Sequence, residues 1–83
     1  LPALDLAAPA LDPVAVAVEL MRHESTSGRE APAVDAMHRL LAARGWRVAR
    51  VPVTDGRDDL FAEGERPAEV VLTTHLDTVP PYL

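Results

Sequence analysis

Apolar side chains recur at helical spacing in the first half of the chain. Asp12 and Pro13 suit the N-cap and first position of a helix, because aspartate accepts from the free amides and proline has no amide to lose there. An apolar stripe at i, i+3, i+4 and i+7 then predicts a helix over about 13–24 (Val14, Ala17, Val18 and Met21). Residues 1–11 hold two prolines and no clean period, so we expect an extended lead-in there.

A second helix is predicted over about 29–44. Ser27 and Glu30 have the spacing of a capping box, in which each side chain bonds the other's backbone amide. Pro32 is tolerable only in the first turn, which moves the helix start toward Glu30. Gly45 suits the position just after the helix. The expected core-facing stripe comprises Val34, Met37, Leu40 and Leu41.

The second half of the chain changes to short strand-like segments separated by turns. Residues 46–53 are rich in valine and predict a strand, with a bulge or edge position at Pro52, which has no amide to donate. The Asp-Gly pair at 55–56 predicts a hairpin to a short strand at about 58–62. A continuous apolar run predicts a third, central strand at about 69–75. The sequence therefore indicates an α/β fold with the order ααβββ.

Composition narrows the classes of protein that fit. The chain has 83 residues and 48% apolar content. Its net charge of −5 disfavours nucleic acid as a partner. We interpret the three arginines between residues 44 and 50 as a solvated strand face. No apolar run could span a membrane, and the absence of cysteine is compatible with a cytoplasmic location. The start at Leu1, the stop after a polar segment and a sheet with one bare face lead us to expect an incomplete domain.

The segment from residue 72 to 82 carries the candidate chemistry. His75 comes where the predicted central strand ends, and Asp77 lies two residues later, so both share one face of an extended chain. The carboxylate could fix the tautomer of a metal-binding histidine, or the two could form an acid/base pair. A structural histidine bonded to a loop is the third reading.

This segment resembles a known signature. The run THLDTVPPY is similar to the first metal-binding motif of the zinc-dependent family of acetylornithine deacetylase, succinyl-diaminopimelate desuccinylase, aminoacylase and carboxypeptidase G. The segments STSGRE, RGWRVARV and RDDLFAE resemble weaker upstream motifs of the same family, with Asp59 where asparagine is commoner. The order and spacing agree along residues 13–82.

The resemblance implies a fold and roles. It implies that residues 1–83 are the N-terminal segment of a three-layer α/β/α catalytic domain with a mixed sheet. His75 would bind one ion of a two-metal centre, usually zinc, with cobalt or another divalent metal as alternatives, and Asp77 would orient it and support catalysis. The reaction would be hydrolysis of an amide bond in N-acyl amino acids or small peptides by metal-activated water. The remaining ligands and the general base would lie beyond Leu83, so we expect the chain alone to be inactive, and the full-length enzyme could be a homodimer.

Two alternatives stay open. The chain could be a small non-catalytic α/β binding module in which His75 and Asp77 form a structural pair, or the full-length relative could have lost activity. The other histidines offer weaker candidates, because His23 suits the end of a helix and His38 is expected to face solvent.

Overall fold

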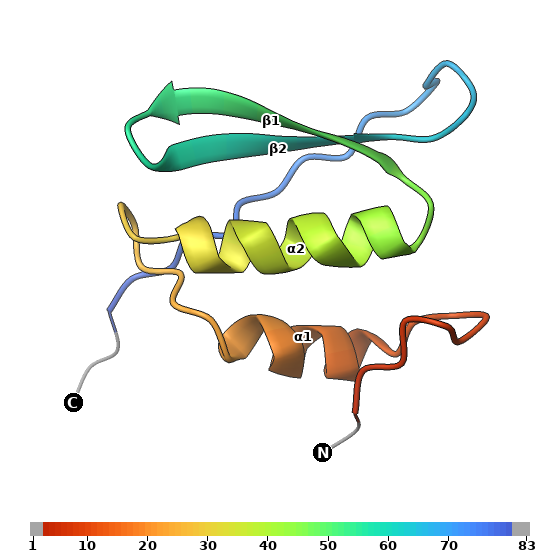
Figure 1. Ribbon diagram of the computed structural model, residues 1–83, viewed down its shortest axis with the longest axis horizontal. Coiled ribbons are helices and arrows are strands. Elements are labelled where there is room, and N and C mark those ends of the chain that lie inside the picture. The colour runs from red at the N-terminus through yellow and green to blue at the C-terminus, as the bar shows by residue number, and fades with distance from the viewer. Residues whose placement is uncertain (1–2, 81–83) are drawn as a thin grey trace.

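The computed structural model describes residues 3–80 and contains two helices followed by a β-hairpin (Figure 1). Helix α1 spans Pro13–Met21 and α2 spans Ala31–Ala43, while strands β1 and β2 span Arg47–Thr54 and Arg57–Glu63. The helices lie side by side in opposite directions, and the hairpin covers the other side of α2 (Figure 1). The predicted α/β class and the first four elements are confirmed.

Helix α1 begins as predicted and ends early. The Asp12 carboxylate accepts from the Val14 amide at 2.9 Å, and Pro13 occupies the first turn. The helix ends at Met21, three residues before the predicted end, because the chain beyond it becomes extended and pairs with a distant segment at Thr26. The amides of Arg22 and His23 turn back to carbonyls three residues earlier, which tightens the last turn.

Helix α2 differs from its prediction at the start. Glu30 is the N-cap residue but makes no side-chain cap, and the Ser27 hydroxyl bonds elsewhere, so the predicted capping box is wrong. Pro32 does lie in the first turn. At the other end Gly45 has φ +88°, and its amide and that of Trp46 bond to Ala42 and Leu41, which forms a Schellman cap.

The core is small and built on alanine. The buried apolar residues come from both helices: Ala15, Ala33, Val34, Ala36 and Leu40. Helix α1 buries Ala15, and the predicted stripe is wrong at Val14, Ala17 and Met21, which are exposed. The reason is that α1 is apolar on several sides, so its periodicity does not select the buried one.

The hairpin is antiparallel and pairs Val48 with Ala62 and Arg50 with Leu60. Its register shifts between Pro52 and Thr54, as the missing proline amide predicted. Arg50 lies between the hairpin and α2, where it forms ion pairs with Asp35 at 2.9 Å and Asp58 at 3.2 Å. The interpretation of all three arginines as a solvated strand face is therefore wrong for Arg50. It is also wrong for Arg44, which ends α2 and whose guanidinium donates to the carbonyls of Leu6, Ala8 and Pro9.

The predicted third strand does not form. Residues 69–75 run back past the hairpin toward the start of α2 (Figure 1) and have no strand pairing among the described residues. Their apolar side chains face solvent, and Leu72 is 92% exposed. A strand needs a neighbouring backbone to bond, and the apolar run alone does not supply one. The order over residues 3–80 is therefore ααββ with an extended tail. In this same range, the helices are too short or too polar to cross a membrane.

Candidate functional site

The tail joins the loop before α2. Thr26 and Thr78 form a parallel bridge, in which the Thr78 amide donates to the Ser25 carbonyl at 2.7 Å and the Ser27 amide donates to the Thr78 carbonyl at 3.1 Å. The Ser25 and Thr78 hydroxyls lie 2.9 Å apart. These bonds place the two candidate residues, His75 and Asp77, beside the start of α2. The end of the motif, Pro81 and Tyr82, lies outside the described residues, as do residues 1–2 of the lead-in.

His75 and Asp77 contact each other. The His75 Nδ1 atom lies 2.9 Å from the Asp77 carbonyl oxygen and 3.2 Å from its carboxylate Oδ1. Both partners accept, so Nδ1 carries the proton and Nε2 keeps its lone pair in the neutral ring. The His75 side chain is 83% exposed and that of Asp77 36%. The imidazole thus exposes Nε2 to solvent, while Asp77 accepts a hydrogen bond from Nδ1.

Asp77 is fixed from a second side by Ser27. The Ser27 hydroxyl donates to Oδ2 of Asp77 at 2.7 Å, across 50 residues of sequence. This hydrogen bond, and secondarily the His75 ring, hold the pKa of Asp77 below its ordinary range. Asp77 therefore stays ionised at neutral pH. Sequence reasoning missed this role of Ser27, because the local pattern assigned its hydroxyl to helix capping.

An ion pair lies next to this group. Arg57, at the start of β2, donates from Nε to Oε1 of Glu30 at 2.7 Å. The hydrogen bond lowers the pKa of Glu30 and raises that of Arg57, and the charge of Asp77 raises the latter further. Glu30 is only 8% exposed, so its charge needs this partner. The pair links the loop before α2 to the hairpin. Glu30 lies in the segment STSGRE and Arg57 in the segment RDDLFAE. The resemblance of both segments to family motifs singled them out in the sequence, but it did not predict their contact.

The donor set suits a metal but is incomplete. Imidazole nitrogen and carboxylate oxygen are ligands that zinc takes, and a catalytic zinc has about three protein ligands. Among residues 3–80, no group of three or more histidine, aspartate or glutamate side chains could hold an ion. Both Asp77 oxygens are already engaged by Ser27 and His75. The described chain thus offers His75 Nε2 as a ligand that would need others to complete a site.

The other histidines are occupied. His23 lies 3.3 Å from Oε1 of Glu19, one turn earlier on α1. His38 is partly buried, with its Nδ1 atom 3.4 Å from the Arg50 guanidinium, so the expectation that it faces solvent is wrong. Neither lies in a cluster that could hold a metal within the described range.

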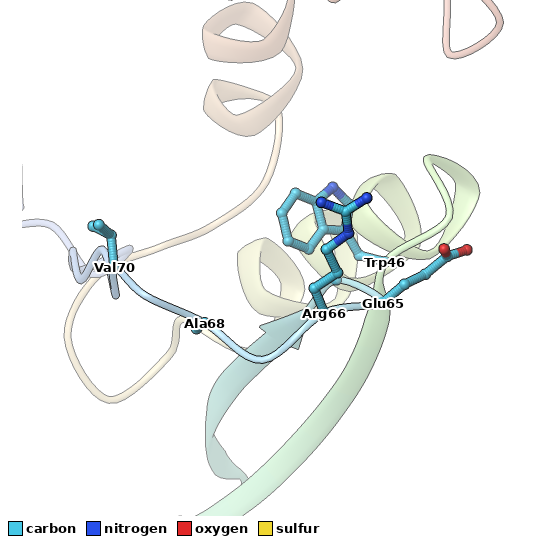
Figure 2. A pocket seen from close by; sticks show the side chains of 6 residues that line it. Trp46, Glu65, Arg66, Ala68 and Val70 are labelled. Atoms are coloured by element: carbon cyan, nitrogen blue, oxygen red, sulfur yellow. The ribbon is translucent and has the colours of Figure 1, made fainter.

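Neither His75 nor Asp77 lines either of two shallow hollows on the surface formed by residues 3–80. Figure 2 shows the larger one, with Trp46, Glu65 and Arg66 at one end and Val70 at the other. It is open to solvent, and Val70 belongs to the unpaired tail. This hollow therefore lies apart from the His75 group.

Comparisons with known proteins relate the chain to hydrolases. It is 39% identical over 69 residues to a probable carboxypeptidase of Aspergillus clavatus, which covers 78% of this chain and 15% of that relative. It is 36% identical over 77 residues to succinyl-diaminopimelate desuccinylase of Rhodopseudomonas palustris, which covers 87% of this chain and 20% of that relative. No protein-family model and no solved structure matches the chain.

The chain thus spans a fifth or less of the length of these curated relatives. The matches cover most of its own residues. Over the matched residues, the chain belongs to the peptidase and desuccinylase family whose signature its THLDTVPP segment resembles.

Proposed function

We propose that this chain forms the N-terminal part of the catalytic domain of a metal-dependent hydrolase. The reaction would add water to the amide bond of an N-acyl amino acid or a small peptide, and would release a carboxylic acid and an amine. One observation carries the proposal: His75 is held at Nδ1 by Asp77 and exposes Nε2, within a segment that resembles the metal-binding motif of this family.

His75 would bind one divalent ion, for which we propose zinc, with cobalt as an alternative. A bound zinc supplies Lewis acidity, which lowers the pKa of water to about 7 and polarises a carbonyl. Asp77 would keep the ring in the tautomer whose Nε2 lone pair is free, and would raise its basicity. Its own low pKa keeps the carboxylate ionised for this purpose. The other ligands of a two-ion centre and the general base would come from the rest of a full-length protein.

Exposed apolar surface supports the proposal of a larger domain. Phe61 and Val51 lie on the hairpin face away from α2, and Val70, Val71 and Leu72 are exposed along the tail. Large apolar side chains exposed in this number are consistent with a surface that another part of a larger protein covers. In a full-length domain these residues would be covered, and the tail would gain the strand partner that it lacks, as in a three-layer α/β/α fold with a mixed sheet.

The test uses the full-length protein that contains this sequence. Its metal content is measured by inductively coupled plasma mass spectrometry, and turnover is measured on N-succinyl and N-acetyl amino acids and on dipeptides. We expect metal-dependent hydrolysis that is lost in His75→Ala and retained in the control His23→Ala, since the His23 side chain pairs with Glu19 and lies outside the His75 group. Full turnover in His75→Ala would refute the proposal and favour a binding module with a structural histidine pair.

The isolated 83-residue chain gives a second test. One exposed imidazole is too few ligands for tight binding, so we expect zinc to be removed by dialysis and hydrolysis to be undetectable. Stoichiometric retention of zinc would contradict this. We further propose a cytoplasmic location, which accords with the absence of cysteine.

A further inference from the structure

The local sequence pattern does not explain the contacts of the Ser27 side chain. Its hydroxyl could cap α2, yet it donates to Asp77 Oδ2 at 2.7 Å, while Oδ1 of the same carboxylate lies 3.2 Å from Nδ1 of His75. The three side chains form one line of hydrogen bonds from the loop before α2 to the exposed ring. Each oxygen of Asp77 has one partner in that line.

We propose that Ser27 is a positioning residue of the metal site, which holds the Asp77 carboxylate so that His75 keeps its proton on Nδ1 and leaves Nε2 free for a divalent ion. The inference rests on the proposed function for its metal, but the arrangement of the three side chains stands on the geometry. Ser27 does not touch the ring and acts only through the Asp77 carboxylate, which adds its contact with Nδ1 to the 2.9 Å contact that the Asp77 carbonyl oxygen already makes.

The hydroxyl matters because the carboxylate is otherwise free to rotate. The terminal torsion angle of an aspartate has a broad, roughly two-fold distribution. One hydrogen bond at 3.2 Å to an exposed ring therefore fixes the orientation of the carboxylate poorly. A second, shorter bond to the opposite oxygen removes that freedom. Partners of this kind set the orientation and basicity of a metal-binding histidine.

The loop that carries Ser27 is itself anchored at both sides. The Ser27 amide donates to the carbonyl of Thr78, the residue after Asp77, and this bond ties the loop to the tail. Gly28 follows with φ +89°, a conformation that turns the chain sharply and suits only glycine. Two residues later the Glu30–Arg57 ion pair fastens the loop to the hairpin. Ser27 is therefore a fixed donor rather than a mobile surface hydroxyl.

The first test reads the ring directly in the 83-residue chain. The ¹⁵N chemical shifts of the imidazole report the tautomer of His75 at a pH where the ring is neutral. We expect Ser27→Ala to shift His75 away from the Nδ1–H form, and Ser27→Thr to preserve that form, since Ser27 is exposed and the extra methyl group has room. The matched control is Ser25→Ala, which removes a hydroxyl bond to Thr78 in the same loop without touching Asp77.

Circular dichroism confirms that each variant is folded as the starting chain is. A His75 tautomer in Ser27→Ala identical to that of the starting chain would overturn the inference. A shift of the same size in Ser25→Ala would also overturn it, because the effect would then come from the loop and not from the Ser27 hydroxyl.

The second test uses the full-length protein. We expect Ser27→Ala to lower zinc affinity, measured by competition with a chelator, by about tenfold, the lower end of what loss of such a partner costs. Ser27→Thr should restore it, and Ser25→Ala should match the starting protein. If Ser27→Ala binds zinc normally while His75→Ala does not, the role of Ser27 is refuted and the proposed function stands. If His75→Ala is fully active, the proposed function fails, and the tautomer measurement still decides whether Ser27 positions the ring.

Discussion

Leu40 offers the sharpest test of how this small fold is held together. It is 7% exposed and is the largest of the buried apolar side chains, most of which are alanines. Truncation to alanine removes its transfer free energy and leaves a cavity, which costs about 2–5 kcal/mol in protein cores. Within this range we expect a loss of about 3 kcal/mol. A chain of 83 residues has a total stability of only about 4–12 kcal/mol.

The assay is urea unfolding followed by far-ultraviolet circular dichroism and Trp46 fluorescence. With a slope of roughly 1 kcal/mol per molar urea, Leu40→Ala should lower the midpoint by about 3 M. The control is Met21→Ala, which truncates a side chain that is 82% exposed and should change stability by less than about 0.5 kcal/mol. A loss below about 1 kcal/mol in Leu40→Ala, at unchanged slope, would refute the assignment of the core to this face of α2.

Three further predictions concern local bonds and charge. Asp12→Ala removes the cap of α1 and should cost about 1 kcal/mol in urea unfolding, and an unchanged midpoint would contradict the capping bond. Gly45→Ala places a side chain at φ +88° and should cost about 1–2 kcal/mol, seen as a lower Tm; an equal or higher Tm would show that the cap is not left-handed in solution. The fold lowers the pKa of Glu30 and Asp77, chiefly through Arg57 and Ser27 respectively. These two carboxylates therefore stabilise the folded state at a pH above the unfolded carboxyl pKa, about 4. This stabilisation is lost as the pH falls below that value. Tm should therefore fall between about pH 5 and pH 2, and an identical fall in the Glu30→Gln and Asp77→Asn double variant would disprove these two groups as its source.

Some features of this protein follow from short stretches of sequence. The N-cap at Asp12, the helix end at Gly45 and the irregular pairing at Pro52 were predicted and are present. Each depends on backbone groups within a few residues, or on a ring that removes an amide, so no distant contact can override it easily. The close approach of His75 to Asp77 is local in the same sense, because two residues separate them.

Other features were decided by contacts across the fold. Ser27 and Glu30 have the spacing of a capping box, yet their side chains bond Asp77 and Arg57, which lie 50 and 27 residues away. The Ser27 hydroxyl gains an ionised acceptor in Asp77, and the Glu30 carboxylate gains a partner of full opposite charge in Arg57, so the distant partners win once the chain brings them near.

Contacts across the fold also explain why the structure differs from the sequence predictions at Arg50 and at residues 69–75. Arg50 was interpreted as facing solvent, but the carboxylates of Asp35 and Asp58 converge on it from α2 and β2 and hold it between layers. The run at 69–75 has the composition of a central strand, but within residues 3–80 it pairs with neither β1 nor β2, and its apolar side chains are exposed. Sequence determined which residues could cap, turn and pair, whereas the tertiary structure decided their partners, because hydrogen bonds and ion pairs form only with the groups that folding brings within reach.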